Sequence, residues 1–160
     1  FVVLIPFKID MEADQRKEQE DVSEKSIKGL HILLAEDNEL NMEIAEFMLQ
    51  NEGADVTKAW NGQEVVELFR KSKPGEFDVI LMDIMMPVMN GYEATKLIRF
   101  LDREDARRIP IIAMTANAFT EDRLKAKEAG MDEHIPKPVD VKLLLKVIRK
   151  LMENSQKENA

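Results

Sequence analysis

Short apolar runs alternate with amphipathic stretches from Leu30 onward, and this alternation predicts strands that alternate with helices. The second apolar run, Ala54–Ala59, differs because the polar residues Asp55, Thr57 and Lys58 interrupt it. This indicates a strand at an edge of the sheet. Three of the other runs are almost wholly apolar, as expected of strands that helices cover on both faces. The pattern predicts an α/β fold of βα units around a parallel sheet, with strands at Leu30–Ala35, Ala54–Ala59, Phe77–Asp83, Ile109–Met114 and Glu133–Ile135.

Apolar residues at helical spacing lie between these strands and predict the helices that cover the sheet. We expect the inward residues to be Leu40/Ile44/Phe47/Met48, Val65/Leu68/Phe69, Ala94/Leu97/Ile98/Leu101 and Val141/Leu144/Leu145/Ile148/Met152. The stretch Thr120–Ala129 differs, because its inward residues are little more than Leu124, Ala126 and Ala129. This helix is therefore expected to be the most weakly held.

The first 29 residues differ from the rest of the chain in composition. Residues 1–9 form a short apolar run, and residues 10–29 contain seven acidic and four basic residues with almost no apolar ones. Such a composition is typical of a solvated linker. We expect the ordered domain to cover residues 30–153, followed by a polar tail over residues 154–160.

Composition excludes several classes of function. A formal net charge of −8 in 160 residues disfavours binding to nucleic acid or anionic lipid by bulk charge, and no Lys/Arg run offers a local basic patch. The chain has no cysteine, which excludes disulfides, Cys-based zinc sites and thiol nucleophiles and favours a reducing compartment. No apolar stretch reaches the roughly 18 residues of a membrane span. We therefore expect a cytoplasmic fragment with no nucleic-acid or membrane partner.

Polar residues of complementary chemistry stand where the predicted strands end. Glu36 and Asp37 follow the first strand, Asp83 ends the third, and Thr115 and Lys137 follow the fourth and fifth. Each of them alone is more typical of a helix cap, a turn or a solvated surface charge. Ligands of open parallel sheets bind beyond the carboxyl ends of the strands, so together these residues indicate one site.

Three carboxylates packed on one rim repel each other unless a cation or a proton is present. Mg²⁺ fits such a group, because it prefers oxygen ligands and no His or Cys accompanies the three acids. An Asp beside a magnesium ion can also attack a phosphoryl group and form an aspartyl phosphate. Lys137 would add a second positive charge to stabilise this reaction.

Four segments resemble the receiver domain of two-component response regulators. They are Ile32-Leu-Leu-Ala-Glu-Asp-Asn38, Val79-Ile-Leu-Met-Asp83-Ile-Met-Met-Pro87-Val-Met-Asn-Gly91, Ile111-Ile-Ala-Met-Thr115-Ala and Ile135-Pro-Lys137-Pro138. The resemblance extends over about Leu30–Met152. It implies a doubly wound, five-stranded parallel sheet of flavodoxin-like order 2-1-3-4-5, with helices on both faces.

The resemblance also implies roles for individual residues. Asp83 would be phosphorylated, Lys137 would contact the phosphoryl group, and Thr115 would report it. Magnesium would be held by Glu36, Asp37, Asp83 and the carbonyl of Met85.

Two positions vary from the family's commonest pattern. The first acidic position is Glu36 instead of Asp, and its longer side chain is suited to reach a metal through water. The aromatic switch position, three residues before the lysine, is His134, which reads equally well as a switch residue or as a plain edge residue.

These roles predict a phosphoacceptor that takes a phosphoryl group from a histidine kinase's phosphohistidine onto Asp83 and then switches a partner-binding surface. The domain would catalyse its own phosphorylation and dephosphorylation. The alternative is a magnesium-dependent phosphatase of the haloacid-dehalogenase type, but Asp83-Ile84-Met85 lacks the second carboxylate of an Asp-x-Asp motif. A receiver-like domain that only binds partners is disfavoured, because Asp37, Asp83 and Lys137 are all present.

Residues 1–9 resemble the closing strand of a histidine-kinase ATP-binding domain, in which an apolar run ending in Ile-Pro-Phe is frequent. A strand of unrelated origin is the alternative. Together with the acidic linker and the receiver, this resemblance leads us to expect a hybrid sensor histidine kinase as the parent protein. The acceptor of the phosphoryl group would then be a histidine phosphotransfer protein.

Overall fold

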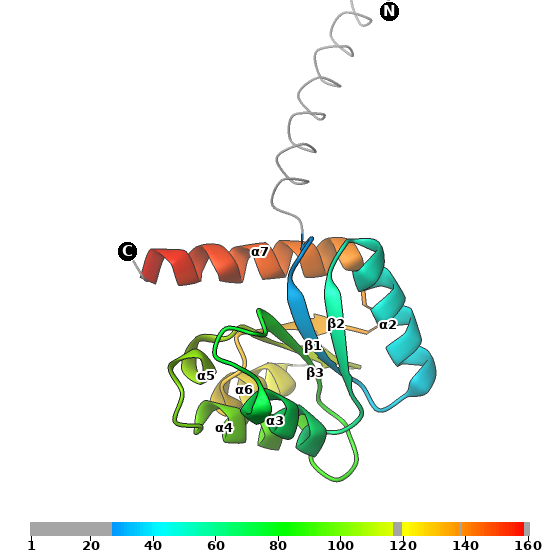
Figure 1. Ribbon diagram of the computed structural model, residues 1–160. Coiled ribbons are helices and arrows are strands. Elements are labelled where there is room, and N and C mark those ends of the chain that lie inside the picture. The colour runs from blue at the N-terminus through cyan, green and yellow to red at the C-terminus, as the bar shows by residue number, and fades with distance from the viewer. Residues whose placement is uncertain (1–26, 117–119, 138, 159–160) are drawn as a thin grey trace, which may run out of the picture.

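A parallel sheet of five strands organises the computed structural model, which describes residues 27–116, 120–137 and 139–158 (Figure 1). The strands follow one another across the sheet in the order β2-β1-β3-β4-β5. This order confirms the 2-1-3-4-5 topology and the edge position of the second strand. The bounds are β1 His31–Ala35, β2 Asp55–Ala59, β3 Val79–Asp83, β4 Ile111–Thr115 and β5 Glu133–Pro136.

Helices cover both faces of the sheet, as expected. Figure 1 shows α2 and α7 on one side and α3, α4 and α6 on the other. Among the described residues, none of the helices combines the length and the apolar character needed to cross a membrane. The bounds are α2 Glu39–Asn51, α3 Gly62–Lys71, α4 Gly91–Arg99, α5 Glu104–Arg108, α6 Thr120–Ala129 and α7 Val141–Glu158.

Three helices begin at asparagines that follow the first three strands. Asn38, Asn61 and Asn90 have extended backbones, and the side chain of each accepts a hydrogen bond of 2.9–3.0 Å from the N–H three residues later. An asparagine at this position satisfies one of the free N–H groups of the first helical turn. These caps fix the start of α2, α3 and α4 close to the carboxyl edge of the sheet.

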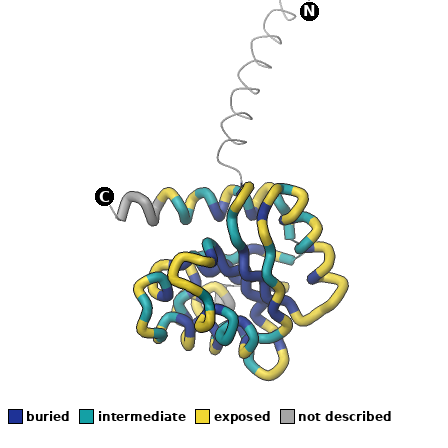
Figure 2. Tube along the Cα trace, viewed as in Figure 1, coloured by how far each residue is buried: buried dark blue, intermediate teal, exposed yellow. Residues whose placement is uncertain are grey.

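The core lies on both faces of the sheet, and Figure 2 shows the central strands as its most buried part. All residues of β3 and β4 are buried, which confirms that apolar runs marked strands covered on both sides. Ile27 is 2% exposed and packs with the core beneath α2 and α7, so the packed chain starts ahead of Leu30. The expected kinase-like strand at 1–9 lies outside the described residues, as does most of the linker.

The inward face of α2 differs from the expected one. Met42, Ala45 and Leu49 are its buried residues. Leu40, Ile44 and Phe47 were expected to point inward, but they are 64%, 48% and 71% exposed. Both triplets have helical spacing, so periodicity alone could not choose between them, and the stripe with the small Ala45 lets the helix approach the sheet more closely.

Helix α6 is anchored by small side chains. Ala126 and Ala129 are each 4% exposed, whereas Leu124 is 56% exposed and does not point inward as expected. The buried apolar area of the described part of α6 is therefore even smaller than its sequence indicated. The short helix α5 was not expected at all, because its five residues have only Ala106 buried and show no helical period.

Candidate functional site

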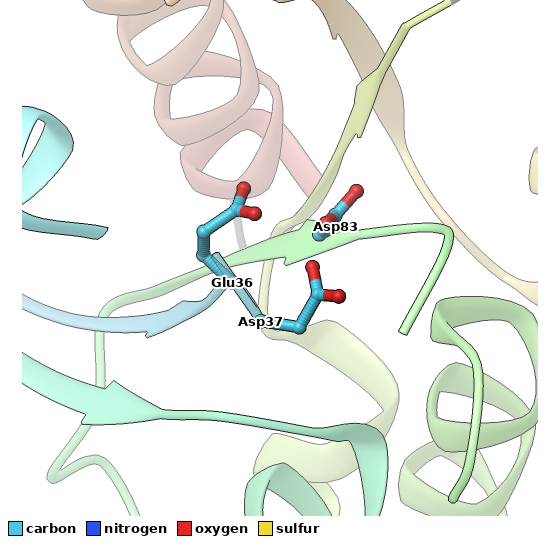
Figure 3. A group of neighbouring side chains, drawn as sticks. All are labelled: Glu36, Asp37 and Asp83. Carbon is cyan, nitrogen blue, oxygen red and sulfur yellow. The ribbon is translucent and has the colours of Figure 1, made fainter. Parts of the chain in front are cut away.

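Three carboxylates meet where β1 and β3 end. Ligand oxygens of Glu36, Asp37 and Asp83 all lie within 4.8 Å of one another, and Figure 3 shows the three side chains gathered there. The register pairs Ala35 with Met82, so the next residues along, Glu36 and Asp83, stand side by side. β1 and β3 are also the strands at which the order of the sheet reverses, which is where open α/β sheets bind ligands.

Lys137 joins two of these carboxylates. Its Nζ lies 2.7 Å from Oε2 of Glu36 and 2.9 Å from Oδ2 of Asp83. The lysine follows β5, and its backbone N–H donates a 2.8 Å hydrogen bond to the carbonyl of Thr115 at the end of β4. This bond anchors the backbone of Lys137 at the carboxyl edge of the sheet, from where the side chain reaches the acids.

Burial and charge shift the ionisation of this group. Burial raises the pKa of Asp83 to about 6, and the negative charges of Glu36 and Asp37 act in the same direction, while Lys137 opposes the shift. Burial lowers the pKa of the Lys137 ammonium, but its hydrogen bonds to Glu36 and Asp83 outweigh this and raise the pKa above its ordinary value. Asp83 is therefore a carboxylate that favours a proton or a cation beside it.

A cleft of about 480 Å³ brings most of the expected site residues together. Thr115, the last residue of β4, is only 6% exposed and lies on its wall. The expected site residues on the wall of this cleft are Glu36, Asp37, Asp83, Met85, Thr115 and Lys137.

His134 is the exception among the expected residues that the structure describes, because it does not line this cleft. It lies on β5 with 20% of its side chain exposed, and its Nδ1 is 3.3 Å from Oε1 of Glu133. In this structure His134 is a half-buried residue of an edge strand, paired with its neighbour.

The loop between β3 and α4 folds tightly back onto the end of β3. Gly91 donates a 2.9 Å hydrogen bond to the carbonyl of Ile84, and a Cβ at Gly91 would collide with the carbonyl oxygen of Asp83. Glycine is therefore required at this position, the first of α4, which the sequence alone did not indicate. Val88 in the same loop has a φ of 69°, a conformation that strains a β-branched residue. Met85 is 77% exposed at the mouth of the cleft.

Three further residues line the cleft that the sequence did not single out, namely Asn41, Tyr92 and Lys125. Asn41 lies in the first turn of α2, and Tyr92 lies in the first turn of α4. Both positions could have been found from the rule that helices begin near the carboxyl ends of the strands. Lys125 comes from α6, and nothing in its sequence context distinguishes it from a solvated lysine.

The carboxylate group fits a hard divalent cation. Its described donors are carboxylate oxygens, with no imidazole or thiolate in the group, and this set suits Mg²⁺ better than zinc or copper. The raised pKa of Asp83 points the same way, because a bound cation would offset both causes of the increase, which are burial first and then the negative charges of Glu36 and Asp37.

Comparison with known proteins agrees with this geometry. The chain matches the family model described as the response regulator receiver domain over residues 32–149. It is 36% identical over 165 residues to Histidine kinase 1 of Arabidopsis thaliana, a match that covers 83% of this chain and 14% of that protein. The chain thus spans a small part of that relative's length. Hybrid signal transduction histidine kinases of Dictyostelium discoideum are among its other relatives.

Solved structures show the same fold. The receiver domain of the sensor histidine kinase PA1611 from Pseudomonas aeruginosa PAO1, with a magnesium ion coordinated in its active site cleft, is 38% identical, with a TM-score of 0.69 and coverage of 78% of this chain and 98% of that one. The receiver domain of Ssk1 from Saccharomyces cerevisiae, crystallised with the histidine phosphotransfer protein Ypd1, is 29% identical, with a TM-score of 0.68 and coverage of 78% and 90%. The family match over most of the chain, together with the 2-1-3-4-5 sheet and the acidic cleft where its order reverses, shows that this chain belongs to the response regulator receiver domain family of two-component signalling.

Proposed function

We propose that Asp83 accepts a phosphoryl group from a phosphohistidine in a magnesium-dependent step of a phosphorelay. The observation that carries this proposal is the position of Asp83. Its carboxylate is 4% exposed at the end of a buried strand, accepts a hydrogen bond from Lys137, and lies within 4.8 Å of two more carboxylates. A buried acid in such a group is costly unless it has a chemical purpose.

In the transfer, an oxygen of Asp83 forms a bond to phosphorus while the bond from phosphorus to the donor's imidazole nitrogen breaks. The imidazole leaves with the electron pair of that bond and keeps the proton on its other nitrogen, so it departs neutral. With a pKa of about 6, Asp83 is mainly ionised at neutral pH and is ready to attack. Lys137 is placed to balance negative charge on the phosphoryl oxygens.

The carboxylates divide into two kinds as candidate magnesium ligands. Both oxygens of Glu36 are engaged, one with Lys137 and the other with the backbone N–H of Asn38 at 3.2 Å. Asp37 is exposed and makes no hydrogen bond or ion pair with a described residue. We therefore assign Asp37, Asp83 and the carbonyl of Met85 as direct ligands and Glu36 as a ligand through water. A bound magnesium ion would neutralise charge that otherwise repels the incoming phosphoryl group.

Thr115 is the proposed sensor of the phosphoryl group. Its side chain is 6% exposed and lies on the cleft wall, where a hydroxyl could donate a hydrogen bond to a phosphoryl oxygen. The chain continues from Thr115 towards α6, the helix anchored by Ala126 and Ala129. A hydrogen bond that draws Thr115 towards the phosphoryl group would therefore displace α6, which is weakly packed. His134 on the neighbouring strand β5 would change its conformation in turn.

The exposed stripe of α2 is the proposed docking surface for a histidine phosphotransfer protein. Leu40, Ile44 and Phe47 form this stripe, and Ile44 also lines an apolar hollow of about 320 Å³ that Glu36 and Lys137 border. A partner that brings its histidine to Asp83 must cover the mouth of the cleft, so apolar side chains beside that mouth would be buried by it. The Ssk1 receiver, which is similar to this chain, was crystallised with such a partner.

Binding measurements can test this surface. Phe47→Ser is expected to weaken binding of a histidine phosphotransfer protein about tenfold or more, since an exposed aromatic at an interface often contributes most. Phe100→Ser is the matched control, because Phe100 is 87% exposed at the end of α4. Equal losses in both variants would refute the α2 surface.

We further propose that the parent protein is a cytoplasmic-facing hybrid sensor histidine kinase, whose kinase core is the phosphohistidine donor. The support is the similarity to receiver domains of histidine kinases. The alternative phosphatase function has less support. Haloacid-dehalogenase-type phosphatases have an acid–base carboxylate two residues after the nucleophilic Asp, and Met85 occupies that position here.

Intact mass spectrometry tests the proposed phosphorylation. Incubation with Mg²⁺ and acetyl phosphate should add one phosphoryl group that resists acid and is released by hydroxylamine. Asp83→Asn or chelation of the metal should abolish the addition. Asp55→Asn is the control, since Asp55 is an exposed carboxylate on β2. Undiminished labelling of the Asp83→Asn protein would refute the proposal.

A further inference from the structure

The cleft around Asp83 contains a second lysine, which comes from α6. Lys125 lines the cleft, and its side chain is exposed. Lys137 is already paired with two carboxylates, at 2.7 and 2.9 Å. Lys125 makes no hydrogen bond or ion pair with any residue whose side chain the structure describes. Its ammonium group is therefore available to a partner that enters the cleft.

The charge of the cleft changes when Asp83 is phosphorylated. Three carboxylates against the Lys137 ammonium leave a net charge of −2, which a divalent cation would cancel. A phosphoryl group on Asp83 then replaces a charge of −1 by nearly −2. The cleft is left with about one negative charge that neither Lys137 nor the metal compensates. The ammonium group of Lys125 carries one positive charge, which would neutralise this remaining negative charge.

Helix α6 is also the element that such an attraction could move most easily. Among its described side chains, Ala126 and Ala129 are the buried ones, while Leu124 is 56% exposed. A helix with so little buried apolar area opposes displacement weakly. An ion pair of Lys125 with a group on β3 would add a tether from α6 to the opposite wall of the cleft.

We propose that Lys125 binds the phosphoryl group on Asp83 and thereby ties α6 to the phosphorylated site. In the unphosphorylated protein this lysine remains solvated. After phosphorylation its ammonium group pairs with a phosphoryl oxygen and acts beside Lys137. This inference rests on the proposed function, because it requires Asp83 to be the phosphoacceptor.

Beryllium fluoride is the probe for the test, because on a carboxylate it carries the same charge as the phosphoryl group and does not turn over. Its affinity for the magnesium-loaded protein is measured by titration calorimetry in wild type and in Lys125→Gln, Lys125→Arg and Lys127→Gln. Lys127 is the matched control, because it lies on α6 with an exposed side chain but does not line the cleft.

Lys125→Gln should weaken beryllium fluoride binding by about two- to fivefold, the range for one partly exposed ion pair. Lys125→Arg and Lys127→Gln should bind like wild type. The difference should vanish at about 1 M salt, where such a pair is screened. Magnesium affinity without beryllium fluoride should be the same in all four proteins, which shows that the variants keep the folded site.

Two results would overturn the role of Lys125 alone. One is wild-type affinity in Lys125→Gln, and the other is an equal loss in Lys127→Gln, which would indicate a general effect of positive charge. A wild-type protein that binds no beryllium fluoride in the presence of magnesium would instead overturn the proposed function, and this inference with it.

Discussion

At the end of β3, Asp83 keeps a carboxylate that is 4% exposed beside Glu36, which is 3% exposed. Their ion pairs with Lys137 offset part of the cost of burying two like charges side by side. The pKa of about 6 for Asp83 shows that the compensation is incomplete. At the scale of single residues, the site is thus prepared for an additional cation.

Magnesium affinity should depend on pH through Asp83. Its pKa of about 6 lies above the ordinary value of 3.8, so protons compete with the metal below pH 6. We expect the affinity to be nearly constant above pH 7 and to fall about tenfold per pH unit below pH 6. Calorimetric titrations from pH 5 to 8 measure this, and a flat profile would contradict the assignment of Asp83 as a ligand.

The same shift affects the stability of the metal-free protein. Because the pKa of Asp83 is higher in the folded state than its ordinary value, its contribution to stability is largest below about pH 4 and is lost as the pH rises through about 6. Asp83→Asn should therefore be more stable than wild type by about 1–2 kcal/mol at pH 7.5, and not at pH 4. Urea unfolding without magnesium at the two pH values provides the comparison.

Val88 is a second residue that the site holds in a costly state. Its φ of 69° is unfavourable for a β-branched side chain, and 75% of the residue is exposed, so little packing compensates for the strain. Val88→Asn should stabilise the protein by about 1 kcal/mol, because asparagine tolerates this conformation. Thermal unfolding would show a higher Tm, and an unchanged or lower Tm would mean that the loop is not strained.

At the scale of elements, Arg99 links α4 to its neighbours. Its guanidinium donates hydrogen bonds of 2.9–3.0 Å to the carbonyls of Ala106 and Gly130 and to the Asp132 carboxylate. Asp132 also accepts a 2.8 Å hydrogen bond from the N–H of Ile111. One side chain therefore connects the end of α4 with α5, with the turn after α6 and, through Asp132, with β4.

Removal of this link should be costly. Arg99→Met is expected to lower the free energy of unfolding by about 2–4 kcal/mol, because it removes the guanidinium donor of the Ala106 and Gly130 carbonyls and the ion pair with Asp132. Arg108→Met is the control, since Arg108 pairs with Glu104 on the surface and should lose less than about 0.5 kcal/mol. A loss of stability in Arg99→Met that is as small as the loss in the Arg108→Met control would show that the Arg99 contacts contribute little.

Helix α6 and the end of β4 should form the switch. Thr115→Ala should still accept a phosphoryl group at Asp83 but should fail to pass the change to α6, because the hydroxyl that contacts the group is missing. Hydrogen exchange of α6 amides, measured with and without phosphorylation, tests this. An equal response in wild type and Thr115→Ala would exclude the proposed role of Thr115.

At the scale of the whole molecule, the sequence predicted the sheet and most of the cleft for one physical reason. Buried strands need apolar runs, and the residue at which such a run stops, as at Asp83, marks the edge where ligands bind. The pairing of Glu36 with Asp83 depends on strand order and on register. The family resemblance supplied the strand order, which apolar runs alone could not, and the structure supplied the register.

Other features depend on contacts that no local pattern encodes. Leu40, Ile44 and Phe47 have the spacing of an inward face, but the competing stripe with Ala45 packs closer to the sheet. The sequence could not predict that Lys125 lines the cleft, because the position of this lysine depends on how α6 packs against the rest of the domain. The requirement for Gly91 arises only from the approach of its backbone to Asp83.

The central claim is that Asp83 itself carries the phosphoryl group, and chemical trapping of the labelled residue tests it most directly. Wild-type protein is incubated with Mg²⁺ and acetyl phosphate, and borohydride then reduces the acyl phosphate to a homoserine that peptide mass spectrometry can locate. We expect homoserine at position 83 only, and none when magnesium is chelated. Reduction of an aspartyl phosphate at position 37 would instead leave homoserine there, and reduction of a glutamyl phosphate at position 36 would leave hydroxynorvaline. Either product together with an unmodified Asp83 would contradict the assignment of the phosphoacceptor.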